Sequence, residues 1–229
     1  LSQEKYDELI KVCDRIIKLD PTFASAYDNR SYAYYKIGKF DLAIIDSYAA
    51  IRLDEKDARL RANFISYSQK NYTLGLAKIA SLIKEFPQKD IWLYIRSQLY
   101  RHKKDYPNAL ADFAKIFEMI PEGYQSYFLS ARAEIYSEMG LHDKAIVDYT
   151  ESITADSSDA SDYGNRGDEY RLIGNYAAAV KDFDKAIEMD PEQPWYYYRR
   201  GWIKDEFLKD PEAGLADYTA SIEIDRDYA

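Results

Sequence analysis

Apolar residues recur at spacings of three and four along most of the chain, which is the period of an amphipathic α-helix. The stretch SAYDNRSYAYYKIG, residues 25–38, keeps this spacing and predicts a helix that ends at Gly38. After a short turn, the stretch FDLAIIDSYAAIRLD, residues 40–54, shows the same spacing again. The strict alternation that is typical of a β-strand appears nowhere. The pattern therefore predicts an all-α chain.

This pair of predicted helices recurs at a nearly constant interval. A small residue in the second helix marks each copy, and consecutive markers are 32, 34, 36, 34 and 35 residues apart. An aromatic residue usually stands three positions before the marker, a small or apolar residue seven after it, and often a proline twelve after it. Such a period indicates a helical hairpin that cannot bury its apolar face alone and must stack on another copy. The markers are Ala43, Gly75, Ala109, Ala145, Ala179 and Gly214.

Glycine and proline occupy the places where a two-helix unit needs them. Gly38, Gly140 and Gly174 fall in the turn between the two helices, where a left-handed backbone conformation suits glycine. Pro107 and Pro211 fall where the second helix should begin, which is the position that tolerates proline best. These residues predict the helix boundaries independently of the apolar spacing.

The recurring positions resemble the tetratricopeptide repeat family, whose unit has characteristic aromatic and small residues at fixed positions. The resemblance covers essentially the whole chain and implies an all-α, right-handed α-solenoid of stacked helical hairpins. Unit 24–57 supplies Tyr27, Ser31, Tyr34, Gly38, Phe40, Ala43 and Ala50. Unit 160–193 supplies every position of the pattern, namely Tyr163, Gly167, Tyr170, Gly174, Tyr176, Ala179, Phe183, Ala186 and Pro191.

We expect a single array over residues 1–229. Residues 1–23 supply only a second helix and residues 226–229 only the start of a unit, so we expect the array or its parent chain to extend further. Unit 58–89 departs most from the pattern, because residues are missing near Gln69–Tyr72. The expected divisions are 1–23 (partial), 24–57, 58–89 (divergent), 90–125, 126–159, 160–193, 194–225 and 226–229 (start of a truncated repeat).

An arginine at position 7 and an aspartate at position 23 occur together in five units, although the family pattern is apolar at position 7. Unit 58–89 has Phe64 and Lys78 instead and lacks both partners. Pairing with the same position of the preceding unit would set Arg30 against Val12, which is not complementary. We therefore predict an ion pair within each unit; the alternative is a coincidence of common surface residues. The pairs are Arg30–Asp46, Arg96–Asp112, Arg132–Asp148, Arg166–Asp182 and Arg200–Asp217.

Composition narrows the class of protein. The 229 residues are 47% apolar and 31% charged, which is enough apolar content for a packed core. The net charge of −9 argues against nucleic acid, because neutralising phosphates needs an excess of Lys and Arg. No apolar run is long enough to insert into a membrane. A single cysteine and no leader pattern in this stretch favour a cytoplasmic location only slightly, so the localisation stays open.

Residues that carry catalysis or bind metals are scarce. His102 and His142 are the only histidines, and no metal-binding, phosphate-binding or nucleophile motif is present. Cys13 stands at a position that is normally a core aromatic, which favours a buried, inert thiol over a reactive one. We therefore expect no enzyme activity, no cofactor and no metal in this stretch.

The resemblance implies that the first helix of each unit lines a concave groove, mainly through positions 2, 5, 9 and 12. Tyr32 and Tyr35 form one aromatic cluster on this stripe, and Trp195, Tyr198 and Trp202 form another; binding hot spots prefer such residues. The alternative is that the tryptophans pack against a further unit or a neighbouring molecule. The candidate ligand-binding residues are Tyr32, Tyr35, Arg59, Tyr94, Arg101, Tyr127, Glu134, Asp168, Arg171, Trp195, Tyr198 and Trp202.

Some domains of this family clamp the carboxyl-terminal tails of heat-shock chaperones. They need Lys and Asn at positions 5 and 9, Asn at position 6 of the next unit, and Lys and Arg at positions 2 and 6 of the third. No window of this chain matches, so we do not expect a chaperone-tail clamp. The first window has Asp28, Tyr32, Asn63, Ile91 and Ile95, and the last has Ser130, Glu134, Asn165, Trp195 and Arg199.

We predict a non-catalytic scaffold or adaptor that binds another protein or an extended peptide in the groove. The alternatives are a recognition or regulatory arm of a larger enzyme or sensor, and self-association through the chain ends. Residues 1–121 carry 20 Lys and Arg against 16 Asp and Glu, whereas residues 122–229 carry 11 against 24. With Glu134, Asp168 and Asp205 on the groove stripe, we expect a basic segment of the partner against residues 126–205 and an acidic one against residues 25–101. Ordinary solvation of these charges is the alternative.

Overall fold

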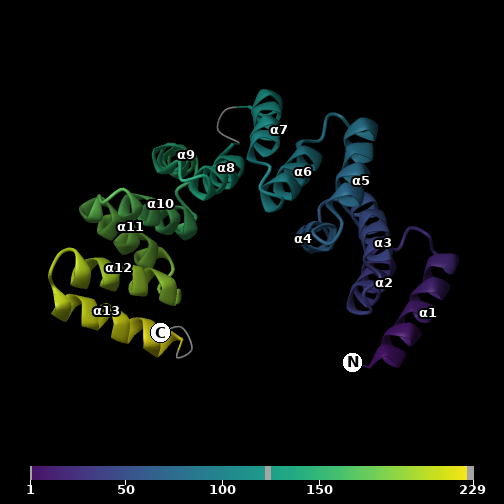
Figure 1. Ribbon diagram of the computed structural model, residues 1–229, viewed down its shortest axis with the longest axis horizontal. Coiled ribbons are helices and arrows are strands. Elements are labelled where there is room, and N and C mark those ends of the chain that lie inside the picture. The colour runs from purple at the N-terminus through teal and green to yellow at the C-terminus, as the bar shows by residue number, and fades with distance from the viewer. Residues whose placement is uncertain (1, 122–124, 226–229) are drawn as a thin grey trace. The chain divides into compact units, whose positions relative to one another are not determined.

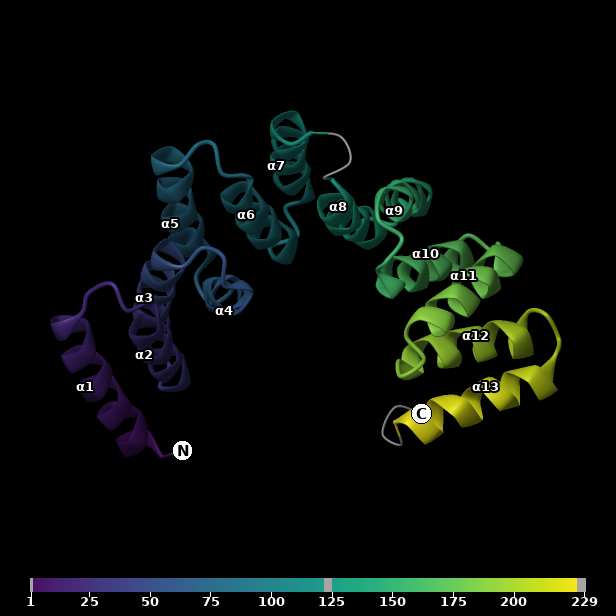
Figure 2. The ribbon, with the colours of Figure 1, turned by 180° about the vertical axis from the view of Figure 1, so that it is seen from behind.

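The computed structural model describes residues 2–121 and 125–225, and within them every regular element is an α-helix (Figure 1). Figure 2 shows the same succession of helices from behind. The all-α fold of stacked helical hairpins that the repeat pattern predicts is confirmed. The thirteen helices of these residues are α1 (Gln3–Leu19), α2 (Ala24–Lys36), α3 (Phe40–Leu53), α4 (Ala58–Ser68), α5 (Tyr72–Glu85), α6 (Asp90–His102), α7 (Tyr106–Met119), α8 (Ser126–Glu138), α9 (His142–Ala155), α10 (Ala160–Leu172), α11 (Tyr176–Met189), α12 (Pro194–Glu206) and α13 (Pro211–Ile224).

The helices form two compact units, Leu1–Met119 and Ile120–Ala229. The first unit contains α1–α7, and its repeats pair α2 with α3 and α6 with α7. The second unit contains α8–α13, where α8 packs with α9, α10 with α11 and α12 with α13. None of the helices described is long and apolar enough to cross a membrane.

Each of the two compact units has an apolar core that lies between its packed helices. In the first unit, Ile44, Phe64 and Trp92 are at most 1% exposed and belong to one cluster that runs from α3 to α6. In the second unit, Phe183 and Ile203 are fully buried between α11 and α12. The core therefore continues from one repeat into the next within each unit, as expected for hairpins that cannot bury their apolar faces alone.

The turns between paired helices require a left-handed backbone. Gly38, Gly140 and Gly174 have φ angles of 77°, 71° and 80°, as their positions predict. Lys104 and Lys209 adopt φ angles of 61° and 58° in the equivalent turns, although they carry a Cβ that disfavours this region. The turn geometry is therefore kept even where the sequence lacks glycine.

The small marker residues lie where paired helices approach most closely. The four alanine markers are fully buried. A Cβ on Gly75 would lie 2.5 Å from the side chain of Ser68, and one on Gly214 would lie 2.8 Å from the Cβ of Asp205. The divergent repeat 58–89 has an α4 of 11 residues, whereas α2 has 13. The shortening falls where residues are missing from the repeat pattern.

All five Arg–Asp pairs expected from the repeat pattern lie at hydrogen-bond distance, and each pair joins the two helices of one repeat. In every pair the arginine donates Nε to one carboxylate oxygen and Nη2 to the other. Such parallel bonds are the strongest form of this interaction. All five aspartates are buried. Burial raises the pKa of the Asp46 carboxyl, and the hydrogen bonds from Arg30 oppose that rise.

Two of these arginines also contact an aspartate of the preceding repeat, which the sequence did not predict. Arg30 Nη1 donates to Asp14 at 2.5 Å, and Arg200 Nη1 donates to Asp184 at 2.6 Å. Asp14 and Asp184 stand two residues after the position equivalent to Asp182, so the spacing of the predicted pairs does not indicate these contacts. The guanidinium groups of Arg30 and Arg200 therefore each join three helices, because the planar fork presents donors in more than one direction.

Candidate peptide-binding surface

On the surface formed by α2 and α4, charged side chains bind one another. Asp28 is buried and accepts a hydrogen bond from Arg59 Nη1 and another, at 2.8 Å, from Asn63 Nδ2. Arg59 is one of the candidate ligand-binding residues on the groove stripe. It is already paired with Asp28, although its side chain remains 58% exposed. This contact links two adjacent repeats of the first unit.

The two tyrosines of the first aromatic cluster have different surroundings. Tyr35 stacks on Tyr67 with ring centroids 4.7 Å apart and packs against the core of the first unit. Tyr32 remains 41% exposed and meets Tyr6 edge to face. Only Tyr32 of this pair therefore presents a substantial aromatic surface to solvent.

The groove-stripe residues of α6 are largely covered. Tyr94 meets Phe113 of α7 edge to face, with ring centroids 6.4 Å apart. Arg101 Nη1 lies 3.5 Å from Gln98 Oε1. Gln98 is buried, and its Nε2 has no hydrogen-bond partner among the described residues. This stretch of the stripe thus combines packed aromatics with one unsatisfied amide.

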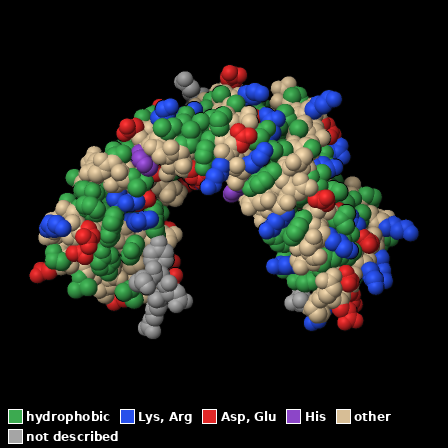
Figure 3. Space-filling view, viewed as in Figure 1, with side chains coloured by type: hydrophobic (Ala, Val, Ile, Leu, Met, Phe, Trp, Pro, Cys, Tyr) green, Lys and Arg blue, Asp and Glu red, His purple; other side chains and the backbone are tan. Residues whose placement is uncertain are grey.

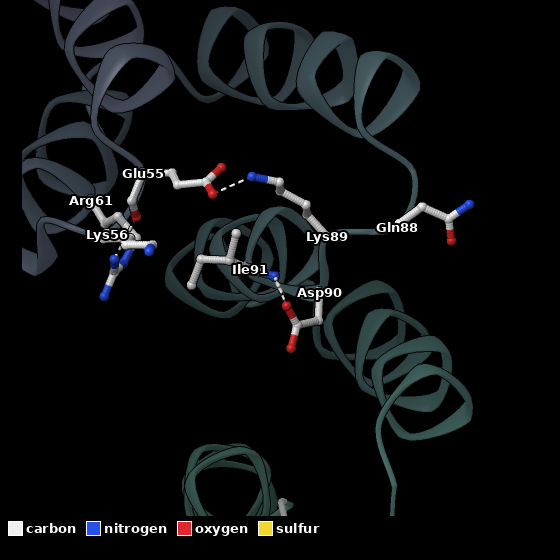
Figure 4. A pocket seen from close by; sticks show the side chains of 7 residues that line it. All are labelled: Glu55, Lys56, Arg61, Gln88, Lys89, Asp90 and Ile91. Atoms are coloured by element: carbon white, nitrogen blue, oxygen red, sulfur yellow. Dashed lines mark hydrogen bonds and ion pairs between the residues drawn. The ribbon is translucent and has the colours of Figure 1, made fainter.

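A depression of about 390 Å³ lies between the turn before α4 and the start of α6 (Figure 4). Glu55 pairs with Lys89 across it, and Arg61 donates to the Glu55 carbonyl at 2.6 Å. The charged side chains that line this depression therefore largely pair with one another. The depression does not indicate a particular ligand. The lining residues are Glu55, Lys56, Arg61, Gln88, Lys89, Asp90 and Ile91.

In the second unit, α8 and α10 are joined by buried polar contacts. Asp162 on α10 accepts hydrogen bonds from Ser130 Oγ at 2.8 Å and Ser152 Oγ at 2.6 Å. Burial raises the pKa of the Asp162 carboxyl, and the two hydroxyl groups oppose that rise only in part. Tyr127 lies near the start of α8 and is 57% exposed, the largest exposure of any aromatic candidate that the repeat pattern identifies.

A second buried carboxylate joins the same repeats. Glu169 on α10 accepts a hydrogen bond from Ser137 Oγ at 2.6 Å and lies 2.7 Å from His142 Nδ1. His142 occupies the turn position that is aromatic in most repeats, and Glu169 is 3% exposed. Ser137 and His142 both contact the Glu169 carboxylate, so these three residues link neighbouring repeats. The histidine does not activate the serine in this arrangement.

The facing sides of α10 and α12 carry a charged and aromatic cluster, defined here as the Arg171–Arg199 cluster (Asp168, Arg171, Trp195, Arg199 and Trp202). Arg171 Nε donates to Asp168 Oδ1 at 2.6 Å, and Arg199 Nε lies 3.5 Å from the same oxygen. Arg171 lies over the ring of Trp202 at 5.1 Å, and Arg199 over that of Trp195 at 5.9 Å. Asp168 therefore faces two arginines of its own chain.

Both tryptophans contact the preceding repeat of the second unit. Trp195 meets Phe183 of α11 edge to face at 5.8 Å. Trp202 meets Phe207 at 5.0 Å, and Phe207 in turn stacks on Tyr176 at 4.1 Å. Tyr198, by contrast, is 38% exposed. The tryptophans are thus partly buried anchors of the surface, and Tyr198 is its more exposed member.

Two further residues bear on the charge of this surface. The Cβ of Asp205 lies close to Gly214, at the contact between α12 and α13. Arg199 was not among the candidates, because position 6 lies outside the stripe of positions 2, 5, 9 and 12. Its contact with Asp168 depends on how α12 packs on α10, and no spacing along the chain indicates it.

Residues that could carry other chemistry are sparse among those described. No group of three or more His, Cys, Asp or Glu side chains in residues 2–121 and 125–225 is arranged to hold a metal ion. Cys13 is 2% exposed, and burial raises the pKa of its thiol, which disfavours the reactive thiolate. Cys13 therefore has the character of a core residue.

The fold and this surface define the chain as a helical-repeat array whose first helices carry aromatic and arginine side chains. Family models agree with the periodicity. Models described as "Tetratricopeptide repeat" match residues 24–57, 126–159 and 67–124, and one described as "TPR repeat" matches residues 167–203. The chain belongs to the tetratricopeptide repeat family.

Relatives in this family are longer than the chain. It is 25% identical over 262 residues to the DnaJ homolog subfamily C member 7 homolog of Schizosaccharomyces pombe, covering 99% of this chain and 54% of that protein. It is 28% identical over 232 residues to the Hsp70-Hsp90 organizing protein of Triticum aestivum, covering 97% of this chain and 39% of that protein. The chain thus spans about half or less of the length of these relatives.

Solved structures show the same fold at low identity. The crystal structure of MamA matches with a TM-score of 0.62 at 13% identity, over 72% of this chain and 94% of that one. This similarity supports the helical-repeat architecture alone.

Proposed function

We propose that the chain is a non-catalytic adaptor that binds another protein or an extended peptide through the first helices of its repeats. The observation that carries this proposal is the second-unit surface of α8, α10 and α12, where Tyr127 and Tyr198 are exposed and Trp195 and Trp202 are partly buried. Tyrosine, tryptophan and arginine are the residues that dominate binding energy at protein interfaces. Membership of the tetratricopeptide repeat family supports the same role.

The polarity of the partner follows from the charges on this surface. A basic segment against residues 126–205 was expected from Glu134, Asp168 and Asp205. Because Asp168 faces two arginines, we assign the basic side chain of the partner to the Tyr127–Glu134 face of α8 in place of α10. There Tyr127 and Glu134 stand seven residues apart on one helix face. A cation beside an aromatic ring and a carboxylate is favourable.

A recognition or regulatory arm of a larger protein is the second candidate. It is favoured by the lengths of the relatives, which exceed that of this chain. In that case the same surface would present a substrate or a regulatory segment to another domain. Self-association of the array through its ends is the third possibility, and size-exclusion chromatography with light scattering at several concentrations would detect it.

The proposal is tested by affinity capture with the intact protein, followed by measurement of affinity for each purified partner. Trp202→Ala and Tyr127→Ala should each weaken binding, whereas Val147→Ala, which removes an exposed apolar side chain from the second helix α9, should not. Circular dichroism melting of each variant separates loss of binding from loss of folding. Partners whose affinity is unchanged by both aromatic substitutions would place the binding site elsewhere on the chain.

A further inference from the structure

The second helix α3 carries a row of exposed apolar residues, defined here as the α3 stripe (Leu42, Ile45, Ala49 and Leu53). These residues are spaced by three and four positions, so they share one face of the helix. Leu42, Ile45 and Leu53 are 42%, 41% and 42% exposed, whereas Ile44 on the inward face is fully buried in the core of the first unit. Figure 3 shows hydrophobic side chains among charged ones on the visible surface of this unit. An apolar face of this kind marks an interaction site.

The same repeat positions carry charged side chains on other second helices. On α11, the two central positions of the stripe are Lys181 and Lys185. On α9 they are Val147 and Glu151, and on α7 the second of them is Lys115. A charge in the middle of the row prevents a continuous apolar face, so the α3 stripe is a property of this one repeat and not of the repeat pattern. In Figure 1, α3 lies between α1 and α5, away from the chain ends.

Opposite charges stand at the two ends of the α3 stripe. Asp41 lies at its start and Arg52 at its end, and they line the same flank because their separation in sequence is close to a whole number of helical turns. Asp41 accepts a hydrogen bond from Asn71 Nδ2 at 2.9 Å, and Arg52 Nη2 donates to Glu85 at 2.5 Å. The side chains of Arg52 and Glu85 are 51% and 40% exposed. Both charges therefore lie in solvent, and a guanidinium or a carboxylate has the capacity for a further partner.

We infer that the α3 stripe is a dimer interface, which packs antiparallel against the α3 stripe of a second copy of this chain. A twofold axis sets the start of one helix beside the end of the other, so each residue meets a different residue of the second copy. Leu42 then packs against Leu53, and the large Ile45 packs against the small Ala49. Two helices approach closely where large and small side chains alternate in this way. The stripe is therefore complementary to itself in shape.

The charges select the antiparallel arrangement. In it, the same flanks of the two helices adjoin, and Asp41 lies beside Arg52 of the second copy at both ends of the stripe. A parallel arrangement would set Asp41 against Asp41 and Arg52 against Arg52, which is repulsive. The inference does not depend on the proposed function, because α3 is a second helix and the proposed peptide-binding surface lies on first helices.

Sedimentation equilibrium of the intact chain over a wide range of concentrations tests the interface. The expected result is a reversible equilibrium of monomer and dimer in the micromolar range, because one pair of helices buries less area than a standard interface. Ile45→Glu should weaken the dimer at least about tenfold, since it places a carboxylate in an apolar contact. Val147→Glu is the matched control, because it puts the same charge at the same repeat position of α9, and it should change the dissociation constant less than about twofold. Circular dichroism melting confirms that each variant is folded.

Charge exchange tests the orientation of the two helices. Arg52→Asp sets two aspartates against each other and Asp41→Arg sets two arginines against each other, so each variant alone should dimerise more weakly than the wild type. An equimolar mixture of the two variants should recover the dimer, because only the mixed pair has opposite charges at both ends of the stripe. Trp202→Ala should leave the dimer unchanged, so loss of the dimer and loss of partner binding are separate outcomes.

Four results would overturn the inference. They are a wild-type chain that stays monomeric at every concentration, an equal loss with Val147→Glu, a mixture of the charge variants that stays monomeric, and a dimer that Ile45→Glu leaves intact. A monomeric wild type that loses a captured protein in the Ile45→Glu variant would show that a different partner covers the α3 stripe.

Discussion

Arg166 holds Asp182 through two parallel hydrogen bonds, each 2.8 Å long, between the first and second helices of one repeat. Tyr163 and Tyr170 lie on the same helix face as the arginine, and its guanidinium is 5.7 Å and 5.9 Å from their ring centroids. The aromatic positions of the repeat therefore line a slot for the arginine as well as filling the core. An apolar residue at the arginine position would leave Asp182 buried without its partner.

Replacing Asp182 with alanine should destabilise the protein by about 3 kcal/mol, because a largely buried guanidinium loses its counter-ion. The side chains of Asp182 and Arg166 are 8% and 15% exposed. Asp184→Ala is the matched control, since this aspartate pairs with Arg200 but is 55% exposed, and its loss should cost less than about 1 kcal/mol. Urea unfolding followed by circular dichroism measures both. Equal destabilisation by the two variants would contradict the structural role of the pair.

The divergent repeat 58–89 should open locally more easily than repeat 160–193. It has Phe64 and Lys78 in place of the ion pair and a shorter first helix, so it lacks the polar contact that joins the helices of other repeats. In repeat arrays, stability is a sum of terms for each unit and its neighbours. Hydrogen exchange should protect amides of residues 164–186 better than those of residues 62–80, and the reverse order would refute this.

Stability should decrease as the pH rises above the ordinary pKa of aspartate, near 3.8, because of Asp162. Its pKa is raised in the folded state, so the folded protein retains the proton more strongly than the unfolded chain. The stabilisation is complete below the ordinary pKa and is lost as the pH rises through the raised value. Asp162→Asn keeps an acceptor for Ser130 and Ser152 and should remove this part of the pH dependence.

Asp156→Asn is the control with the opposite sign, because hydrogen bonds from Ser158 lower the pKa of the Asp156 carboxyl. Its contribution is present above the ordinary pKa and is lost as the pH falls through the lowered value. The free energy of unfolding, measured in urea at a series of pH values, separates the two effects. An Asp162→Asn variant with an unaltered pH profile would show that this carboxyl has an ordinary pKa in the folded protein.

Paired substitutions should test the left-handed turns in both directions. Gly174→Ala places a Cβ at a φ of 80° and should cost about 1 kcal/mol, although nothing lies within 4 Å of the added carbon. Lys104→Gly removes a Cβ at a φ of 61° and should stabilise the protein by about 0.5 kcal/mol. Thermal melting of both variants suffices, and a destabilising Lys104→Gly would show that the lysine side chain compensates for its backbone.

The sequence alone determined the features that lie within one repeat. The helix pairs and the Arg–Asp pairs follow from spacings that recur six and five times, and the glycine turns from a spacing that recurs three times, so each copy tests the others. These features are local because a hairpin of two helices places fixed positions opposite each other in every copy. The shorter α4 was likewise visible as a shorter repeat.

Only the tertiary structure decided what happens between neighbouring repeats. The guanidinium of Arg30 reaches Asp14, Tyr35 joins the core, and Asp168 faces Arg199 on the next first helix. These contacts depend on the packing of adjacent helices and on side-chain rotamers, which no period along the chain encodes. For that reason the sequence predicts which face binds a partner, whereas packing decides which charges on this face are already paired within the chain.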